Sequence, residues 1–374
     1  MAEWQGSVET VVRGTMLDFF KGKRVFITGH TGFKGTWLST ILIMAGADVT
    51  GFALPPDREE SLFTLSGIGG QMTSVLGDIR DYEKLKNAFD RARPELVIHM
   101  AAQPLVREGY RDPVGTYAVN VMGTVHLLEC VRQSDEVRSF LNVTTDKVYQ
   151  NNQWPWGYRE QDELNGFDPY ANSKSCSELV TSSYCKSFFR NRITSVSTAR
   201  AGNVIGGGDF AADRIIPDCI RAARGGNPIQ LRNPKSVRPY QHVLDPLSAY
   251  LLIMQRQWEN PDVAGCYNVG PESGDCVTTG ALADMFCESW GNNLSWECVS
   301  DNGPHEDAIL RLDCSKIHSI LGWNPQWNIR QAVAETVGWT KKWIDGESPL
   351  DCMRQQIERF FKCPSAKNGE NVNG

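Results

Sequence analysis

The chain has 374 residues, of which 41% are hydrophobic and 22% are charged, and its formal net charge is −6. This composition is typical of a globular protein with one large domain or two smaller ones, and a slightly acidic chain without Lys/Arg-rich runs disfavours a polyanion-binding function. No stretch approaches the ~20 apolar residues that span a bilayer, and the chain does not open on a basic segment followed by an apolar run, so we expect a cytoplasmic protein.

Apolar runs rich in Val, Ile and Phe alternate with helical patterns up to about residue 200. The apolar runs predict strands at 24–28, 48–54, 73–77, 95–101, 139–145 and 193–199. The intervening segments predict helices at about 34–46, 81–92, 114–133 and 169–189. This alternation is typical of βαβ units, and it predicts an α/β fold with a Rossmann-type, doubly wound parallel sheet.

After about residue 200 the alternation ends, and Gly and Pro become frequent. We therefore expect a smaller, irregular α/β lobe that binds the substrate. The expected division is a Rossmann domain at 18–200 to which 237–262 returns, a second lobe made of 201–236 and 263–360, and disordered tails at 1–15 and 365–374.

The cysteines do not suggest a disulfide framework. There are eleven, they are scattered, and no C-x-x-C pair occurs. We expect buried free thiols and no metal site.

A glycine-rich turn, TGHTGFKG (28–35), joins the first predicted strand to a helix. Gly29 permits the tight turn, Gly32 lets the backbone approach a pyrophosphate, and Gly35 allows close contact between helix and strand. The free N–H groups at the start of the helix favour an anion. The pattern indicates a dinucleotide site, and the alternative is a plain strand-to-helix turn.

The ends of the next two strands give weaker signals for a cofactor. Asp78 and Ile79, after the third strand, are candidates for an adenine contact or an ordinary surface turn. The acidic residue that usually holds the cofactor ribose is missing after the second strand, where Leu54 and two prolines stand. No arginine directly follows Leu54 to receive a 2′-phosphate. We therefore expect loosely bound NAD rather than NADP.

Two Y-x-x-x-K patterns occur in the chain. Tyr82 and Lys86 fall on an amphipathic helix, where the spacing places both side chains on one exposed face, and we interpret this pair as functionally neutral. Tyr170 and Lys174 fall on the helix that follows the strand ending in TTDK. A lysine one turn from a tyrosine can lower the pKa of the phenol, which a general base for an alcohol requires.

Polar residues follow the apolar strand SFLNV (139–143) without a break, in the order Thr144, Thr145, Asp146 and Lys147. Buried polar groups are costly unless they are paired or used, and ligands of doubly wound sheets bind at the carboxyl ends of the strands. We therefore expect these residues to face a site. The alternative is a structural ion pair of Asp146 with Lys147.

Six segments together resemble the extended short-chain dehydrogenase/reductases, and among them the nucleotide-sugar 4,6-dehydratases. They are TGHTGFKG, HMAAQPLV (99–106), NVMGTVHLLE (120–129), TTDKVY (144–149), DPYANSK (168–174) and RAGNVIGGGD (200–209). Lys147 and the aromatic segment NNQWPWGYRE (151–160) make the chain most similar to the members that act on CDP-glucose. The resemblance covers roughly residues 18–345.

This resemblance implies conversion of CDP-D-glucose to CDP-4-keto-6-deoxy-D-glucose, a step of deoxysugar biosynthesis that uses NAD. Tyr170, assisted by Thr145, would take the proton of the C4 hydroxyl, and Lys174 would bind the nicotinamide ribose. Asp146 would protonate the leaving C6 hydroxyl. Lys147 would stand near C5, either as a neutral base or as a cation that stabilises the enolate.

The resemblance also implies the binding residues. The cofactor would contact Gly29, Thr31, Gly32, Phe33, Lys34, Gly35, Asp78, Ile79, Ala101, Ala102, Gln103, Tyr170 and Lys174. The substrate diphosphate would contact Asn203, Arg214 and Arg238.

Some features keep two interpretations. His242 is either a buried structural imidazole or a ligand, and Trp154 and Trp156 either cap the site or pack a loop. The helices at 81–92 and 114–133 resemble those that form a four-helix bundle between subunits, so we expect a homodimer or homotetramer. Two rival functions stay open: a 4-epimerase or 4-reductase of the same family, and a non-catalytic dinucleotide sensor.

Overall fold

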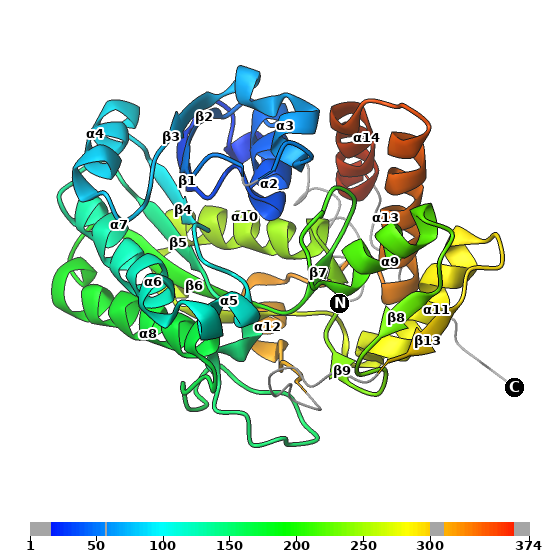
Figure 1. Ribbon diagram of the computed structural model, residues 1–374. Helices are drawn as coiled ribbons and strands as arrows, with labels where there is room; N and C mark the ends of the chain where they lie inside the picture. Colours follow the sequence, from blue (N-terminus) through cyan, green and yellow to red (C-terminus); the bar gives the residue numbers. More distant parts are fainter. Residues whose placement is uncertain (1–15, 57, 300–309, 363–374) are drawn as a thin grey trace, which may run out of the picture.

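The computed structural model describes residues 16–56, 58–299 and 310–362, so both tails expected to be disordered lie outside the described residues. A seven-stranded sheet of order β11-β6-β5-β4-β1-β2-β3 forms its centre (Figure 1). Its strands are β1 (Arg24–Thr28), β2 (Asp48–Ala53), β3 (Thr73–Leu76), β4 (Leu96–His99), β5 (Ser139–Val143), β6 (Ser195–Ala201) and β11 (Cys266–Val269). Every neighbouring pair is parallel, which confirms the predicted doubly wound fold.

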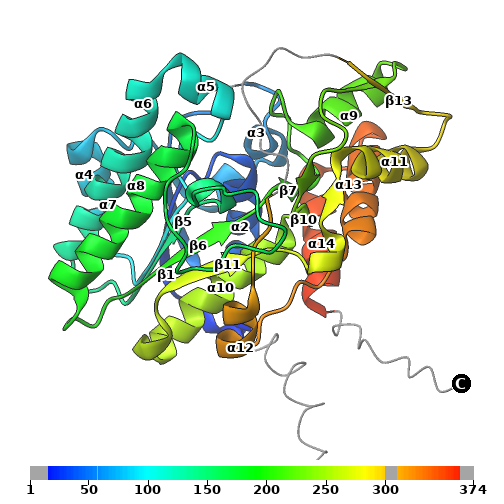
Figure 2. The same cartoon turned by 90° about the horizontal axis from the view of Figure 1, so that it is seen from below.

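Helices cover both faces of this sheet (Figure 2). One face carries α2 (Phe33–Met44), α10 (Leu244–Glu259) and α12 (Ser315–Leu321), with α14 (Pro349–Lys362) packed on α2. The other carries α4 (Tyr82–Ala92), α7 (Gly123–Arg132) and α8 (Pro169–Tyr184). Side chains alternate between the two faces along β1: Val25 and Ile27 enter the core under α2 and α10, and Phe26 enters the core under α4 and α7.

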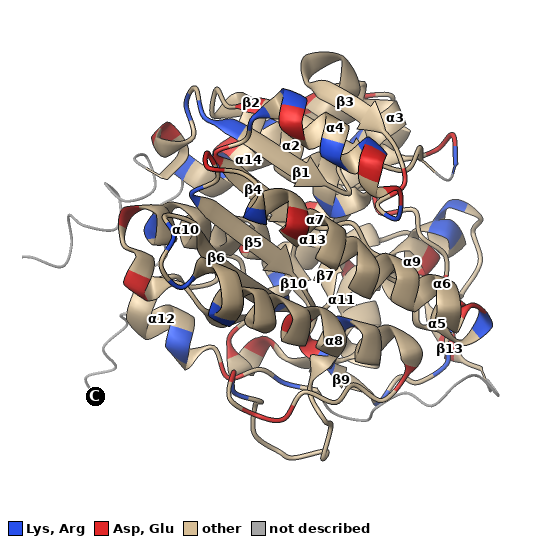
Figure 3. Ribbon diagram, turned by 90° about the vertical axis from the view of Figure 1, so that its left-hand side faces the viewer, with Lys and Arg blue, Asp and Glu red and all other residues tan. Residues whose placement is uncertain are grey.

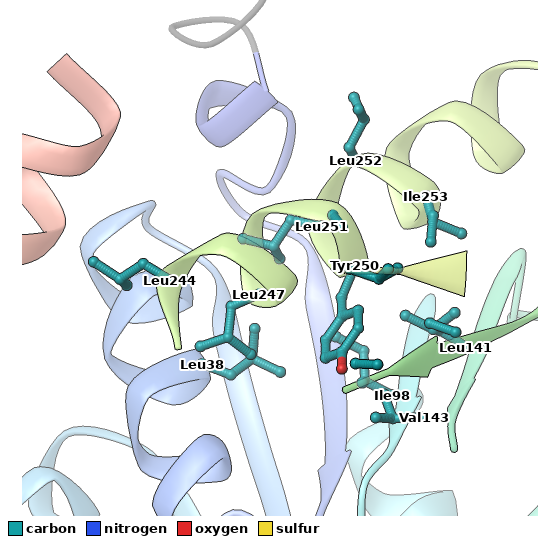
Figure 4. Packing of buried hydrophobic residues seen from close by; sticks show 14 of the residues in the cluster. Leu38, Ile98, Leu141, Val143, Leu244, Leu247, Tyr250, Leu251, Leu252 and Ile253 are labelled. Carbon is teal, nitrogen blue, oxygen red and sulfur yellow. The ribbon is translucent and has the colours of Figure 1, made fainter. Parts of the chain in front are cut away.

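The helix α10 links the sheet to the second lobe. It is buried along almost its whole length and packs against β5, β6 and α2. Figure 4 shows Leu247 beside Leu38 of α2, and Tyr250 above Val143 and Ile98 at the ends of the central strands. The side chain of Tyr250 therefore packs against the carboxyl ends of the central strands.

The second lobe lies beside the sheet and has its own core around Ile220, Phe286 and Val333. Its helices are α9 (Ile215–Arg224), α11 (Thr279–Trp290) and α13 (Ile329–Ile344). Its short strands pair in twos: β7 (Val204–Ile205) with β10 (Gln241–His242), β9 (Val237–Arg238) with β12 (Val277–Thr278), and β8 (Ile229–Leu231) with β13 (Trp296–Cys298). The predicted irregularity of this lobe is confirmed.

The chain path differs from the expected division at β11, α12 and α14, which lie with the large sheet, and at β9 and β10, which pair in the second lobe. Residues 263–360 were assigned to the second lobe, but β11 pairs with β6 in the large sheet, and α12 packs on β11. The strand CYNV stands between Gly265 and Gly270, in the region after residue 200 where the regular alternation of strands and helices ends. The large sheet therefore contains residues 266–269, which the sequence pattern assigns to the second lobe.

Two further observations concern the described part of the chain. All the cysteines that the structure describes are unpaired, but only Cys130, Cys219, Cys314 and Cys352 among them are buried as expected. Among the described helices, none combines the length and the apolar character needed to cross a bilayer.

Candidate functional site

The glycine-rich turn after β1 has the shape of a phosphate cradle. Gly29 has φ +80°, and a Cβ atom there would lie 2.8 Å from the backbone nitrogen of Ala101. A Cβ on Gly35 would lie 2.1 Å from the carbonyl oxygen of Gly29. The helix α2 begins after Gly32 without a side-chain cap and without an acidic residue in its first turn. Its first N–H groups are thus available to an anion, and the turn fits the pyrophosphate of a dinucleotide.

This geometry gives a test of the turn. We expect Gly35→Ala to raise the dissociation constant for NAD at least ~10-fold, because the added methyl group must push the helix away from the turn. Isothermal titration calorimetry measures the change. Gly70→Ala is the matched control, since nothing lies within 4 Å of a Cβ at that position. Equal affinities of the two variants would contradict the role of the turn.

Three residues predicted to contact the cofactor, Thr31, Asp78 and Ile79, lie near the ends of β2 and β3. The hydroxyl of Thr31 donates to the carbonyl of Leu54, at the point where an acidic residue is missing. Asp78 accepts from the guanidinium of Arg80, which holds the pKa of the Asp78 carboxyl below its usual value. Ile79 is buried, and its carbonyl binds Nδ1 of His126. Asp78 is therefore engaged by its own turn.

The residues after β4 lie next to the glycine-rich turn, because β4 and β1 are neighbouring strands. The backbone nitrogen of Ala101 donates to the hydroxyl of Thr28. Gln103 is fixed at two points, because its backbone nitrogen donates to Asn120 and its amide donates to Thr116. The predicted contacts from Ala101 to Gln103 thus lie at the point where the strand order reverses, between β1 and β4.

One face of α8 is joined to the carboxyl end of β5. The amine of Lys174 donates to the carbonyl of Val143 at 3.0 Å, and Tyr170 is hydrogen-bonded to Thr145. Both Tyr170 and Lys174 are buried. The helix positions these groups because Asp168 caps it and Pro169 opens it, so the Y-x-x-x-K spacing begins in the first turn.

The strand β5 is two residues shorter than the strand predicted at 139–145. The strand ends at Val143, and Asp146–Val148 form a short 3₁₀ turn. The hydroxyl of Thr145 donates to Oδ1 of Asp146 at 2.9 Å. The ammonium of Lys147 lies 3.4 Å from the same Oδ1 and 3.4 Å from Oδ1 of Asn203. The turn therefore gathers Thr145, Asp146 and Lys147 at one point.

The ion pair of Asp146 with Lys147 exists, but it does not satisfy the carboxylate. Asp146 is fully buried, and its Oδ2 atom has no hydrogen-bond partner among the described residues. A buried carboxylate oxygen without a partner is costly and uncommon. A Cβ atom on Gly202 would lie 3.3 Å from this oxygen, and the charge of Asp146 acts on the pKa of Tyr170. The arrangement favours a reactive carboxylate over a structural pair.

Burial dominates the ionisation of this site. It raises the pKa of Tyr170 to about 12, against the opposing effects of the Thr145 hydrogen bond and of Arg214. It lowers the pKa of Lys174 to about 8, and it also lowers the pKa of Lys34 to about 8, with Arg214 and Lys174 contributing. Desolvation of the phenolate outweighs the attraction of Arg214, and the expectation that Lys174 brings the phenol toward neutrality stays a prediction.

The residues expected to bind a diphosphate lie on the second-lobe side. Asn203 contacts Lys147. Arg214 directly precedes α9, pairs with Asp209 at 3.2 Å and acts on the pKa of Tyr170. Arg238 lies on β9, is nearly buried, and donates to the carbonyl of Val237. The structure brings Asn203 and Arg214 to the predicted catalytic residues.

The surroundings of His242 and Lys86 decide between the interpretations of these two residues. His242 is buried between Trp37 and Trp327, and burial lowers its pKa to about 3, so it is a neutral structural imidazole. Lys86 pairs with Asp90 on α4, as expected of an exposed helix face.

The aromatic segment after the catalytic turn forms a stack. Trp154 stacks on Tyr158, which stacks on the buried Tyr149. Trp156 is exposed and borders a cleft of about 270 Å³ that Arg159 also lines. Trp154 therefore packs this loop.

A buried ion pair beneath the site was not predicted. Glu178 of α8 accepts from Nε and Nη2 of Arg200 on β6, each at 3.0 Å. Arg200 also donates to the hydroxyl of Tyr149. The spacing of Glu178, four residues after Lys174, was a readable signal for the same helix face. Its partner comes from a different strand, which the spacing does not reveal.

Comparison with known proteins identifies relatives. The model of the GDP-mannose 4,6 dehydratase family matches residues 26–336. A CDP-glucose 4,6-dehydratase of Salmonella typhimurium is 46% identical over 350 residues, which cover 92% of this chain and 98% of that protein. The extent of both matches shows shared ancestry along almost the whole chain.

Solved structures agree with the fold. The UDP-glucose 4-epimerase of Thermus thermophilus in complex with NAD has a TM-score of 0.73 and is 26% identical, covering 84% of this chain and 97% of that one. The dTDP-glucose 4,6-dehydratase of Bacillus anthracis in complex with NAD also has a TM-score of 0.73, at 22% identity, and covers 87% and 99%. The second likeness concerns the fold alone.

Proposed function

Because the chain belongs to the GDP-mannose 4,6 dehydratase family, we propose that it is a CDP-glucose 4,6-dehydratase that forms CDP-4-keto-6-deoxy-D-glucose. The observation that carries this proposal is the turn after β5, which gathers Thr145, Asp146 and Lys147 beside Tyr170. The substrate follows from the 46% identity with a protein of that name.

The residues of the glycine turn would hold NAD as the cofactor. Its pyrophosphate fits the start of α2 at Gly32, and the nicotinamide ribose would lie near Tyr170 and Lys174. Bound NAD would supply the oxidation of the sugar at C4 and the return of hydride to C6. The protein itself orients the sugar and moves its protons.

Tyr170 would take the proton of the C4 hydroxyl, with Thr145 sharing its hydrogen bond. A ketone at C4 acidifies the proton at C5. Lys147 would stand near C5, where its amine in the neutral form would take the C5 proton and, once protonated, would stabilise the enolate by its charge. Asp146 would give a proton to the leaving C6 hydroxyl through its unpartnered Oδ2.

Arg214, Arg238 and Asn203 would hold the substrate from the second lobe. Arginine suits a diphosphate because its planar fork donates two parallel hydrogen bonds. In the structure Arg214 pairs with one carboxylate, Asp209, and its side chain is about one third exposed. The guanidinium is therefore oriented and still accessible.

The rival functions fit the site less well. A 4-epimerase or 4-reductase needs Thr145, Tyr170 and Lys174, but it needs no acid for C6 and no charge at C5. Asp146 with its open oxygen argues against it. A non-catalytic dinucleotide sensor does not need the buried Tyr170 and Lys174 pair that the structure places at the sheet edge.

Incubation with CDP-, dTDP-, GDP- and UDP-glucose, each with added NAD or NADP, tests the function. We expect a 4-keto-6-deoxy product, detected by its absorbance in base, from CDP-glucose with NAD and little product from the other pairs. Dependence on added NAD follows from the missing ribose carboxylate after β2. An epimerised product, or faster turnover with NADP, would overturn the proposal.

We also propose that the protein is a homodimer or homotetramer in the cytoplasm. Exposed apolar side chains gather on α8 and the segments beside it: Leu179 on α8, Met122 at the end of η2 (Ala118–Met122) and Phe188 in η4 (Cys185–Phe189). Figure 3 shows α7 and α8 side by side, with charges along α4 and few on α8. These observations favour α7 and α8 as the pairing helices, in place of α4.

Sedimentation should therefore report at least twice the 41.7 kDa of one chain. We expect Leu179→Glu to weaken the association at least ~10-fold, because it buries a charge between like helices. Ile344→Glu is the control, since Ile344 is an exposed residue of α13, in the second lobe. A monomeric wild type, or equal effects of both variants, would contradict the proposed pairing.

A further inference from the structure

The carboxylate of Glu178 is buried and fully engaged. Its side chain is 1% exposed, and each of its oxygens accepts two hydrogen bonds. Oε1 accepts from the hydroxyl of Thr144 and from Arg200, and Oε2 accepts from the hydroxyl of Thr198 and from Arg200. Glu178 therefore joins α8 to β6 and to the residue that follows β5.

Three residues of α8 bond to three consecutive residues, from the last residue of β5 to the residue before the 3₁₀ turn. Tyr170 is bonded to Thr145, Lys174 to the carbonyl of Val143, and Glu178 to Thr144. Residues four apart lie on one face of a helix, so this stripe holds the turn at three adjacent points. Glu178 is its third member.

Glu178 also acts on Lys174 through its charge. Burial lowers the pKa of Lys174 to about 8, and the attraction of Glu178 opposes this effect. The other charged or titratable groups that act on or respond to Lys174 are Lys34 of α2 and His99 of β4, and burial keeps His99 neutral. The stabilising charge thus comes from Glu178.

We propose that Glu178 is a positioning residue of the active site: its buried carboxylate holds Thr144 in place and keeps the amine of Lys174 in its cationic form. The cationic amine makes stronger, charge-assisted hydrogen bonds to the Val143 carbonyl and to a ribose. The inference rests on the proposed function only in treating Lys174 as a group of the active site.

Two variants separate this role from plain structural support. Arg200→Met removes the partner cation and leaves Glu178 charged. Glu178→Met/Arg200→Met removes both charges and fills the space with apolar side chains of similar size, which is often neutral for stability. Only the double variant withdraws the negative charge from Lys174.

Competitive labelling with a trace of acetic anhydride reads the titration of each lysine directly, followed by peptide mass spectrometry. Over a series from about pH 6 to 10, the label on Lys174 rises as the amine loses its proton. We expect the midpoint for Lys174 to fall by about one pH unit or more in the double variant, because a nearby opposite charge is lost. In Arg200→Met it should stay or rise.

Lys34 is the internal control. Its pKa is also lowered to about 8, and Glu178 is not among the groups that act on it, so its midpoint should not move. An unchanged midpoint for Lys174 in the double variant, or a fall in Arg200→Met, would overturn the proposal. Labelling needs neither NAD nor CDP-glucose, so failure of the proposed function would show separately, as absence of turnover by the wild type.

The decline in kcat at high pH gives a second measure. If the cationic form of Lys174 supports turnover, activity is lost as the pH rises through its pKa, and this decline should begin at lower pH in the double variant. Arg200→Met should lower stability without moving the decline downward. A merely structural role of Glu178 would change stability in both variants and leave the pH profile in place.

Discussion

Lys147→Met should lower the rate of dehydration by ~10²–10⁴ and leave oxidation of the sugar intact, because the change removes the proton-transfer group near C5 and spares Tyr170, Thr145 and Lys174. The side chain of Lys147 is 28% exposed and makes two contacts at 3.4 Å, so its replacement should not disrupt the fold. The enzyme should stall between oxidation and elimination.

Stopped-flow mixing with CDP-glucose tests this outcome. The absorbance of reduced cofactor should build up on the enzyme, with little exchange of solvent deuterium into C5. Tyr170→Phe should show neither signal, since the first proton transfer is then blocked. Lys84→Met, which changes an exposed lysine of α4, should behave as the wild type. Normal turnover of Lys147→Met, or a stall without reduced cofactor, would return Asp146 and Lys147 to a structural ion pair.

Arg200→Met should lower the free energy of unfolding by ~3–5 kcal/mol, because it leaves Glu178 charged and unpaired in the interior. The guanidinium is 2% exposed. Burial acts to lower the pKa of Arg200, but the attraction of Glu178 prevails and raises it above its usual value. The pair is therefore held by mutual attraction, and removal of one member leaves the desolvation of the other uncompensated.

Urea unfolding measures this loss, with a lower midpoint and an unchanged slope. Arg330→Met is the matched control: Arg330 pairs with Glu288 at 3.1 Å, but the two side chains are 69% and 67% exposed. Exposed pairs contribute ~0–1 kcal/mol. A loss below ~1 kcal/mol in Arg200→Met would mean that water reaches Glu178 and that the network is not the closed unit described above.

The sheet was predictable because its strands are apolar on both faces. Phe26 between Val25 and Ile27 shows why β1 reads as a continuous apolar run, with each neighbour entering a different core. The strand β11 was not predicted because it lies after residue 200, where the regular alternation of strands and helices has ended. The long helix predicted at 114–133 is interrupted by the π turn η2, which hydrophobic spacing does not distinguish from a regular helix.

The candidate site was predictable where its members are close in sequence. Thr145, Asp146 and Lys147 are adjacent, and Tyr170 and Lys174 are one helical turn apart, so spacing alone places them. The high pKa of Tyr170 was not predictable, because it depends on how deeply the phenol is buried. The partnership of Glu178 with Arg200 joins a helix to a strand more than twenty residues away and requires the fold itself.

The position of β11 in the chain, far after the other strands of the large sheet, limits where the protein can be cut into stable fragments. A chain shortened before Cys266 would leave β6 as the edge of the sheet, with its ladder of backbone groups unpaired along a strand whose side chains are all buried. Such an edge is a template for pairing with another molecule. Fragments that carry only the dinucleotide half of the protein should therefore aggregate, and a separable cofactor-binding module would have to include the distant β11 segment.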